Sequence, residues 1–188
     1  MAIYAISDLH LSLGIEAKPM DVFGTHWTNY VDRLKENWLN VIKEDDVVLM
    51  AGDFSWSTYL EDSKPDFEFL ESLPGKKILL KGNHDYWWTT LKKLNEFIEE
   101  NDFKSISFVY NNSIELENAV VCGTRYWAHE EAYDNEKIFN RECERAKISL
   151  KSIQETANKK PIIFMTHYAP DERIIDCVKD FDIKYWIY

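Results

Sequence analysis

The chain has 188 residues, of which 45% are hydrophobic and 29% are charged, and its formal net charge is −11. This balance is typical of a globular domain and excludes a disordered chain. The acidic surplus argues against nucleic acid and anionic membranes as partners, because both require a basic footprint. No apolar run is long enough to span a bilayer. We therefore predict one domain over residues 1–188, without a membrane partner and of unknown oligomeric state.

Three cysteines occur, at positions 122, 143 and 177. The number is odd and no pair has the C-x-x-C spacing, which argues against a disulfide framework or a zinc knuckle. We therefore expect reduced thiols and a cytoplasmic protein.

Buried strands alternate with helices in the first half of the chain. Short apolar runs predict strands at residues 3–7, 47–51 and 77–80. Helical spacing of apolar residues predicts helices at 27–42, 66–73 and 91–100. Thr25 is a candidate N-cap for the first of these helices.

The second half of the chain has shorter strands. We expect them at residues 106–110, 113–116, 119–122 and 161–166, with another at the end of the chain, 185–188. The turns Asn111-Asn112 and Glu117-Asn118 predict antiparallel hairpins. A long charged helix is expected over 134–157. The pattern predicts an α/β fold with mixed sheets.

Four polar clusters directly follow four of the apolar strands. They are Asp8-Leu9-His10, Gly52-Asp53, Gly82-Asn83-His84-Asp85 and His167. Ligands of α/β folds bind beyond the carboxyl ends of strands, so these side chains are expected to gather there. Carboxylate and imidazole together favour zinc, manganese or iron over calcium, and one carboxylate can bridge two ions. Asp8 and His10 are two residues apart, which places them on the same side of an extended strand.

The four clusters in this order resemble the calcineurin-like metallophosphoesterase superfamily, over the whole chain. The similarity is greatest to small bacterial phosphohydrolase-type members, through residues 5–12 and 80–88. The resemblance implies a four-layer α/β/β/α sandwich with two mixed sheets. It also implies two divalent metal ions, of manganese, iron or zinc, and hydrolysis of a small phosphomonoester or phosphodiester by a metal-bound hydroxide.

The resemblance also implies a role for each site residue. Asp8 and His10 would bind the first metal, Asp53 would bridge both metals, and Asn83 and His167 would bind the second. His84 would act as general acid or stabilise the charge that develops on phosphate. Its unperturbed pKa near 6.5 suits proton transfer. Asp85 either orients His84 or caps the following helix.

The sequence departs from the family pattern in two places. Gly52-Asp53 is followed by Phe54-Ser55-Trp56-Ser57. In the protein Ser/Thr phosphatases the Gly-Asp motif continues with Asp-Arg-Gly, so this branch of the superfamily is disfavoured. The closing Gly-His-x-His motif, with one histidine for each metal, does not occur in residues 1–188. We therefore expect a C-terminally incomplete domain whose metal sites each lack one imidazole. An inactive metal-binding homologue or a nuclease is the alternative function, and the net charge argues against the nuclease.

Arg125 follows a predicted strand and is a candidate for holding a phosphate oxygen. A surface ion pair with Glu130 or Glu131 is the alternative. His26 and His129 are expected at the surface or as capping residues. Several aromatic residues lie beside the motif clusters and would either stack on a nucleobase or fill the core, namely Trp56, Tyr86, Trp87, Trp88 and Trp127.

Overall fold

A computed structural model describes residues 1–15, 20–127, 136–154, 157 and 159–188 of the chain. Two compact units are formed, one by Met1–Leu79 with His84–Phe108 and the other by Leu80–Asn83 with Val109–Tyr188. The described residues contain two four-stranded sheets, with strand orders β1-β2-β3-β4 and β5-β6-β7-β8. The predicted α/β class is confirmed. That residues 1–188 form a single domain stays a prediction.

The first unit is built on the sheet of β1 (Ile3–Ile6), β2 (Val47–Met50), β3 (Lys76–Leu80) and β4 (Ile106–Val109). Strands β1, β2 and β3 are parallel, with Ile6 opposite Met50. All four residues of β2 are buried, as expected for a central parallel strand covered on both faces. Because β1 and β2 are in register, the segments that follow them leave the sheet at the same edge.

The described part of this unit contains the α-helices α1 (Tyr30–Val41), α2 (Lys64–Glu71) and α3 (Leu91–Glu100). Single 3-10 turns form at Met20–Phe23, Thr25–Trp27 and Glu61–Ser63. The predicted cap at Thr25 is wrong, because this residue starts a 3-10 turn and Asn29, with φ 52°, precedes α1. Helix α3 has the predicted bounds, and the side chain of Thr90 accepts a hydrogen bond from Lys93 N–H at its start.

Aromatic side chains fill the core of the first unit. The fully buried Phe67 lies at its centre and contacts the rings of Phe54, Trp87, Phe97, Phe103 and Phe108, at centroid distances of 4.9–6.2 Å. Trp88 packs edge-on against Phe108 at 5.3 Å. Trp87 and Trp88 are therefore core residues, whereas 59% of Tyr86 is exposed.

The second unit is built on a mixed sheet of β5 (Ser113–Glu115), β6 (Val120–Gly123), β7 (Ile162–Met165) and β8 (Ile183–Ile187). Strands β5 and β6 are antiparallel, joined through the predicted turn at Glu117-Asn118, and β7 and β8 extend the sheet in parallel. The hairpin predicted at Asn111-Asn112 is wrong, because β4 and β5 belong to different sheets. The side chain of Asn112 instead accepts a hydrogen bond from Tyr110 N–H at 2.6 Å, which is a local turn.

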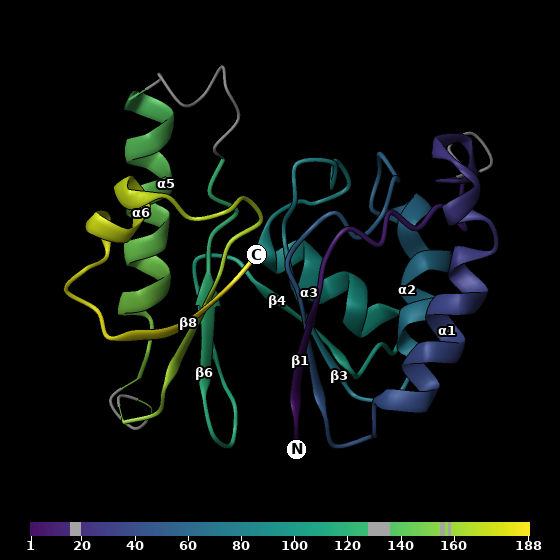
Figure 1. Ribbon diagram of the computed structural model, residues 1–188, viewed down its shortest axis with the longest axis horizontal. Helices are drawn as coiled ribbons and strands as arrows, with labels where there is room; N and C mark the ends of the chain where they lie inside the picture. The colour runs from purple at the N-terminus through teal and green to yellow at the C-terminus, as the bar shows by residue number, and fades with distance from the viewer. Residues whose placement is uncertain (16–19, 128–135, 155–156, 158) are drawn as a thin grey trace. The chain divides into compact units, whose positions relative to one another are not determined.

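Helices α5 (Glu136–Lys151) and α6 (Glu172–Cys177) pack on this second sheet (Figure 1). Their shared core includes Cys122, Tyr126, Cys143, Ala146, Leu150, Phe164, Ile174 and Val178. The long helix was expected over 134–157 and ends earlier, at Lys151, while residues 134–135 and 155–156 lie outside the described part. No helix in the described ranges is both long and apolar enough to cross a membrane.

Candidate metal centre

The segments that follow β1 and β2 continue to run side by side beyond the sheet. Asp8 N–H donates to the carbonyl of Gly52 at 3.0 Å, and His10 N–H donates to the carbonyl of Asp53 at 2.9 Å. This backbone pairing brings together two clusters that are more than 40 residues apart in the sequence. Asp8, His10 and Asp53 consequently share one corner of the first unit.

All three of these residues have a left-handed backbone conformation. Their φ angles are 57° for Asp8, 47° for His10 and 53° for Asp53. This region costs about 1–3 kcal/mol for a residue other than glycine, and residues strained in this way cluster at functional sites. Strand β1 ends at Ile6, so the alternation expected of an extended strand does not apply to Asp8 and His10. Their side chains converge because the backbone turns at both positions.

The ligand atoms of the three side chains form a compact group. His10 Nε2 lies 3.6 Å from Asp8 Oδ1 and 3.6 Å from Asp53 Oδ2, and the three ligand atoms lie within 4.8 Å of one another. These separations are too long for hydrogen bonds. They suit ligands of one cation, since zinc ligands lie about 2.0–2.2 Å from the ion. The donor set therefore fits a divalent metal.

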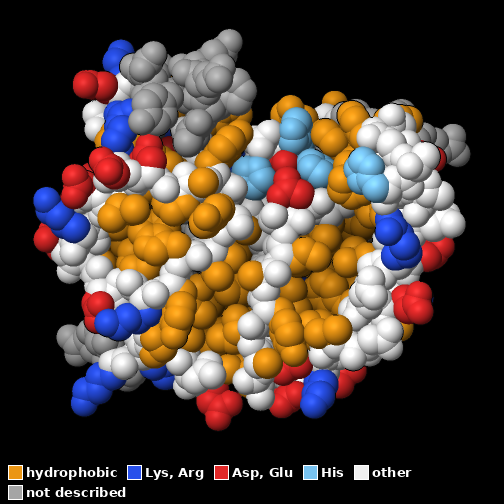
Figure 2. Space-filling model, in the orientation of Figure 1, with side chains coloured by type: hydrophobic (Ala, Val, Ile, Leu, Met, Phe, Trp, Pro, Cys, Tyr) orange, Lys and Arg blue, Asp and Glu red, His pale blue; other side chains and the backbone are white. Residues whose placement is uncertain are grey.

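Burial differs among the three members of this group. His10 and Asp53 are buried, whereas the side chain of Asp8 is 50% exposed. Acidic and histidine side chains lie next to one another on the face of the molecule shown in Figure 2. The group is thus held by buried side chains and remains open to solvent on the Asp8 side.

Asp53 uses its two carboxylate oxygens differently. Oδ2 faces His10, and Oδ1 accepts a hydrogen bond from the backbone N–H of His84 at 2.8 Å. The ring of Trp56 stacks on the His10 imidazole at 4.5 Å and lies 4.7 Å from the His84 imidazole. Trp56 therefore packs against both predicted site histidines. Its position three residues after Asp53 in the sequence suggests that it lies near the site, but does not specify these ring contacts.

Asp85 is fully buried and holds the loop that carries Asp53. Its carboxylate accepts hydrogen bonds from the backbone N–H groups of Asp53 at 2.9 Å and Phe54 at 2.9 Å, and from the indole of Trp87 at 3.0 Å. The predicted helix cap at Asp85 is wrong, because α3 starts six residues later at Leu91 and Thr90 caps it. Asp85 fixes the backbone of Asp53, a role that its sequence position beside His84 does not indicate.

We expect Asp85→Ala to reduce the free energy of unfolding by at least about 3 kcal/mol. The change leaves several buried N–H groups without an acceptor, at about 1–3 kcal/mol each. Urea denaturation measures the loss, and Asp180→Ala, which removes an exposed carboxylate, is the control. A loss as small as that of the control would show that Asp85 does not hold the loop.

A second buried carboxylate, Asp66 on α2, ties the two loops to the helix. It accepts hydrogen bonds from Leu13 N–H at 2.7 Å and from the Ser55 hydroxyl. Burial raises the pKa of Asp66 from 3.8 to about 6, while both hydrogen bonds act in the opposite direction. The carboxyl therefore binds its proton more tightly in the folded protein than in the unfolded chain.

This raised pKa predicts a stability that falls with pH. The contribution of Asp66 is fully present below about pH 4 and is lost as pH rises through about 6, because the unfolded chain binds fewer protons in this window. At 1.36 kcal/mol per pKa unit the difference amounts to about 3 kcal/mol. Urea denaturation should show that the free energy of unfolding of the wild type decreases from pH 4 to pH 7. In Asp66→Asn this decrease should be smaller by about 3 kcal/mol. Parallel pH profiles of both proteins would contradict the assignment.

Asn83 and His167 form a second pair, within the second unit. His167 Nε2 lies 2.7 Å from Asn83 Oδ1. His167 follows β7, and its backbone N–H donates to the carbonyl of Arg125 at 3.0 Å. An amide oxygen and an imidazole nitrogen both suit a borderline divalent cation. The structure therefore brings Asn83 together with His167, and it brings Asp8, His10, Asp53 and His84 together in the first unit.

The remaining candidates are Arg125, His26 and His129. The Arg125 guanidinium lies over the ring of Trp127, 4.1 Å from its centroid. Its alternative partners Glu130 and Glu131, and likewise His129, lie outside the described residues. His26 is exposed, as expected, and its ring lies 5.5 Å from that of Trp27.

Comparison with known proteins identifies the family. The family model described as calcineurin-like phosphoesterase matches residues 1–188. This chain belongs to the calcineurin-like phosphoesterase family. The family's two-sheet α/β architecture agrees with the two sheets of the described residues. Metal-dependent phosphoester hydrolysis is the chemistry of this family, and the Asp8, His10 and Asp53 group supplies a fitting set of metal ligands.

One curated protein and two solved structures are similar to this chain at 12–33% identity. The uncharacterized protein MJ1445 of Methanocaldococcus jannaschii is 33% identical over 86 residues, which are 44% of this chain and 46% of that protein. The chain thus spans about half the length of the curated relative it matches. Among solved structures, the protein of unknown function AQ665 from Aquifex aeolicus has 23% identity and a TM-score of 0.49, covering 100% of this chain and 89% of its own. The phosphopantetheinyl hydrolase PptH from Mycobacterium tuberculosis has 12% identity and a TM-score of 0.49, covering 93% and 70%.

Proposed function

We propose that this protein hydrolyses a small phosphomonoester or phosphodiester with the help of two divalent metal ions. The observation that carries the proposal is the group of Asp8, His10 and Asp53, whose ligand atoms lie within 4.8 Å of one another on strained, left-handed backbone. Strain of this kind persists where function requires the geometry. Membership of the calcineurin-like phosphoesterase family supports the reaction class.

Each residue of the site receives a role in this proposal. Asp8 and His10 would hold the first ion, Asn83 and His167 would hold the second, and Asp53 would contribute to both. The buried position of Asp53 and its hydrogen bond from His84 N–H fix the direction of its carboxylate. Manganese, iron and zinc all suit this mixture of carboxylate, amide and imidazole ligands. Bound cations of this kind lower the pKa of coordinated water and neutralise charge on a phosphate group.

His84 is proposed to donate a proton to the leaving oxygen. Its backbone N–H is anchored on Asp53, and its ring lies 4.7 Å from that of Trp56 and 5.6 Å from that of His10. These contacts hold the His84 imidazole beside the group of Asp8, His10 and Asp53. His84 itself is not one of the proposed metal ligands. An imidazole can act as a general acid when it is positioned beside the leaving oxygen.

The substrate is proposed to be a small molecule, because a net charge of −11 does not favour a polyanion. A cytoplasmic location also stays a proposal, supported by free thiols at Cys122, Cys143 and Cys177.

The proposal is tested by metal content and turnover measured on the same samples. Purified protein is freed of metal with a chelating resin and then loaded separately with manganese, iron or zinc. Hydrolysis of bis(p-nitrophenyl) phosphate and of p-nitrophenyl phosphate is then followed. We expect activity that depends on the added metal. Hydrolysis that is as fast in the metal-free sample, or none with any of the metals, would refute the proposal.

A further inference from the structure

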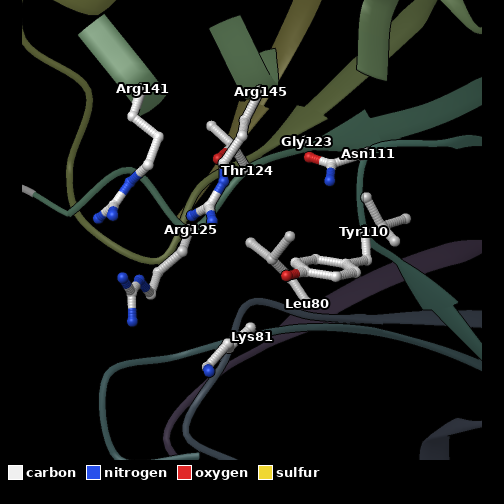
Figure 3. Close-up of a pocket in the computed structure, with 10 residues that line it drawn as sticks. Leu80, Lys81, Tyr110, Asn111, Gly123, Thr124, Arg125, Arg141 and Arg145 are labelled. Carbon is white, nitrogen blue, oxygen red and sulfur yellow. The ribbon is translucent and has the colours of Figure 1, made fainter. Parts of the chain in front are cut away.

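A small cavity in the second unit is lined by four cationic side chains. Its volume is about 210 Å³, and Lys81, Arg125, Arg141 and Arg145 form the charged part of its lining (Figure 3). The described lining residues include no carboxylate. Such a concentration of positive charge is unexpected in a chain whose net charge is −11. The cavity is smaller than the roughly 300–1,000 Å³ of pockets that enclose a whole drug-sized ligand, so it fits a single group of a larger molecule.

Helix α5 supplies two of the four cations. Arg141 and Arg145 are four residues apart and therefore lie on the same face of the helix. The buried Glu142 lies between them in sequence, 2.8 Å from Arg145 Nη1 and 3.8 Å from Arg141 Nε. Its carboxylate also accepts a hydrogen bond from the Thr124 hydroxyl at 3.0 Å. One carboxylate thus positions these arginines and leaves the cavity with a positive surplus.

Arg125 approaches the cavity from the segment that follows β6 (Figure 3). Its Nε is buried and has no hydrogen-bond partner among the described residues. Burial lowers the pKa of the Arg125 guanidinium, and the nearby charge of Glu142 acts in the opposite direction. Arg125 as a whole is half-buried, but a buried N–H donor without an acceptor is unfavourable, and a bound anion would supply the acceptor.

Two segments that line the cavity are linked through the backbone to Asn83 and His167 of the second unit. The Arg125 carbonyl accepts the hydrogen bond from His167 N–H at 3.0 Å. Lys81 is two residues before Asn83 in the sequence. The backbone segments that position the cations are therefore the segments that position two proposed metal ligands.

We propose that this cavity binds a phosphate group of the substrate other than the one that is hydrolysed, so that the preferred substrate carries at least two phosphates. Guanidinium groups bind phosphate through paired, charge-assisted hydrogen bonds, and three of them converge here. The catalytic half of this inference rests on the proposed function, whereas phosphate binding by the cavity does not.

Phosphate binding is tested directly with pyrophosphate. Isothermal titration is carried out in a phosphate-free buffer of low ionic strength, on protein from which divalent metals have been removed with a chelating resin. We expect binding by the wild type and an increase in Kd of about 10-fold or more in Arg141→Gln and in Arg145→Gln, as lost hydrogen bonds to a charged group imply. Arg33→Gln, which removes the same charge from an exposed position in the first unit, should leave Kd unchanged.

The two variants differ in their structural risk. Arg145 is bound to the buried Glu142, so its loss can disturb the fold, whereas Arg141 is exposed and lies 3.8 Å from that carboxylate. Thermal unfolding of Arg141→Gln should therefore match the wild type. No binding by the wild type, or an equal Kd in wild type and Arg141→Gln, would overturn the inference.

Turnover then separates this inference from the proposed function. Phosphate release from glucose 1,6-bisphosphate and from glucose 1-phosphate is measured with metal-loaded protein. Arg141→Gln should raise KM about 10-fold for the bisphosphate and leave KM for the monophosphate unchanged. Pyrophosphate binding without hydrolysis of any phosphate ester would support the anion site and overturn the proposed function. Hydrolysis of a phosphate ester without pyrophosphate binding would support the proposed function and overturn the anion site.

Discussion

Asp53→Asn is expected to lose bound metal and, with it, hydrolysis of phosphate esters. The asparagine keeps an oxygen that can accept the hydrogen bond from His84 N–H, so the loop is disturbed little. It removes the negative charge of the carboxylate that faces His10 and that we propose to bind both ions. Elemental analysis after dialysis against a defined metal concentration measures the loss, together with turnover of a chromogenic phosphodiester. Asp180→Asn provides a control with the same chemical change at an exposed position.

Asp53→Ala tests the same position with a variant that also removes the hydrogen-bond acceptor. It removes the acceptor of His84 N–H as well as the charge, so it should lose metal and also some stability. If both Asp53 variants retained as much metal as Asp180→Asn, the bridging role would be refuted. Metal loss confined to the alanine variant would show that Asp53 acts through the fold of the loop.

His84→Ala should lower kcat by about 10²–10⁴-fold and leave the metal content nearly unchanged. The range is the contribution that a general acid typically makes. The backbone N–H of His84 persists in the variant, so its hydrogen bond to Asp53 is retained. Metal content and kcat are measured on one preparation. His26→Ala is the matched control, because it removes an exposed imidazole next to Trp27.

Two results would reverse this assignment. Loss of metal in His84→Ala would make His84 a ligand, and a kcat equal to that of His26→Ala would exclude it from catalysis. A pH profile distinguishes the two proposed forms of catalysis by His84. Proton donation predicts that the decline of kcat at high pH disappears in His84→Ala, whereas stabilisation of charge lowers kcat and leaves the shape of the profile similar.

The order of the polar clusters predicted that Asp8, His10 and Asp53 converge, and the structure brings these three together. Buried strands before Asp8 and Asp53 indicate strand ends, and the parallel pairing of β1 with β2 brings these two ends together. The left-handed backbone at Asp8, His10 and Asp53 was not predictable in the same way, because the residue types there do not require it. It results from the pairing of the two loops beyond the strands, which is a long-range property. The convergence was thus predicted for a reason that differs from the actual one.

Local signals failed where tertiary contacts decide the structure. The turn at Asn111-Asn112 resembles the turn of a hairpin, yet the chain there passes from one sheet to the other. Helix α6 has six residues, too few for a helical period to be recognised. Asp85 follows His84 in the sequence, but its carboxylate binds the backbone of residues 53–54, about 30 positions away. Nothing close to Asp85 in the sequence indicates these partners.

The three left-handed residues have a consequence for laboratory evolution. Glycine adopts this conformation without the steric cost that Asp8, His10 and Asp53 incur. Glycine at Asp8 also removes one of two clustered carboxylates, which repel each other when no cation is bound. A library selected for heat resistance in metal-free medium should therefore accumulate glycine at the half-exposed Asp8 and lose this metal ligand. Adding the divalent cation during selection reverses the bias, because the cation binds the native state and stabilises the variants that keep their metal ligands.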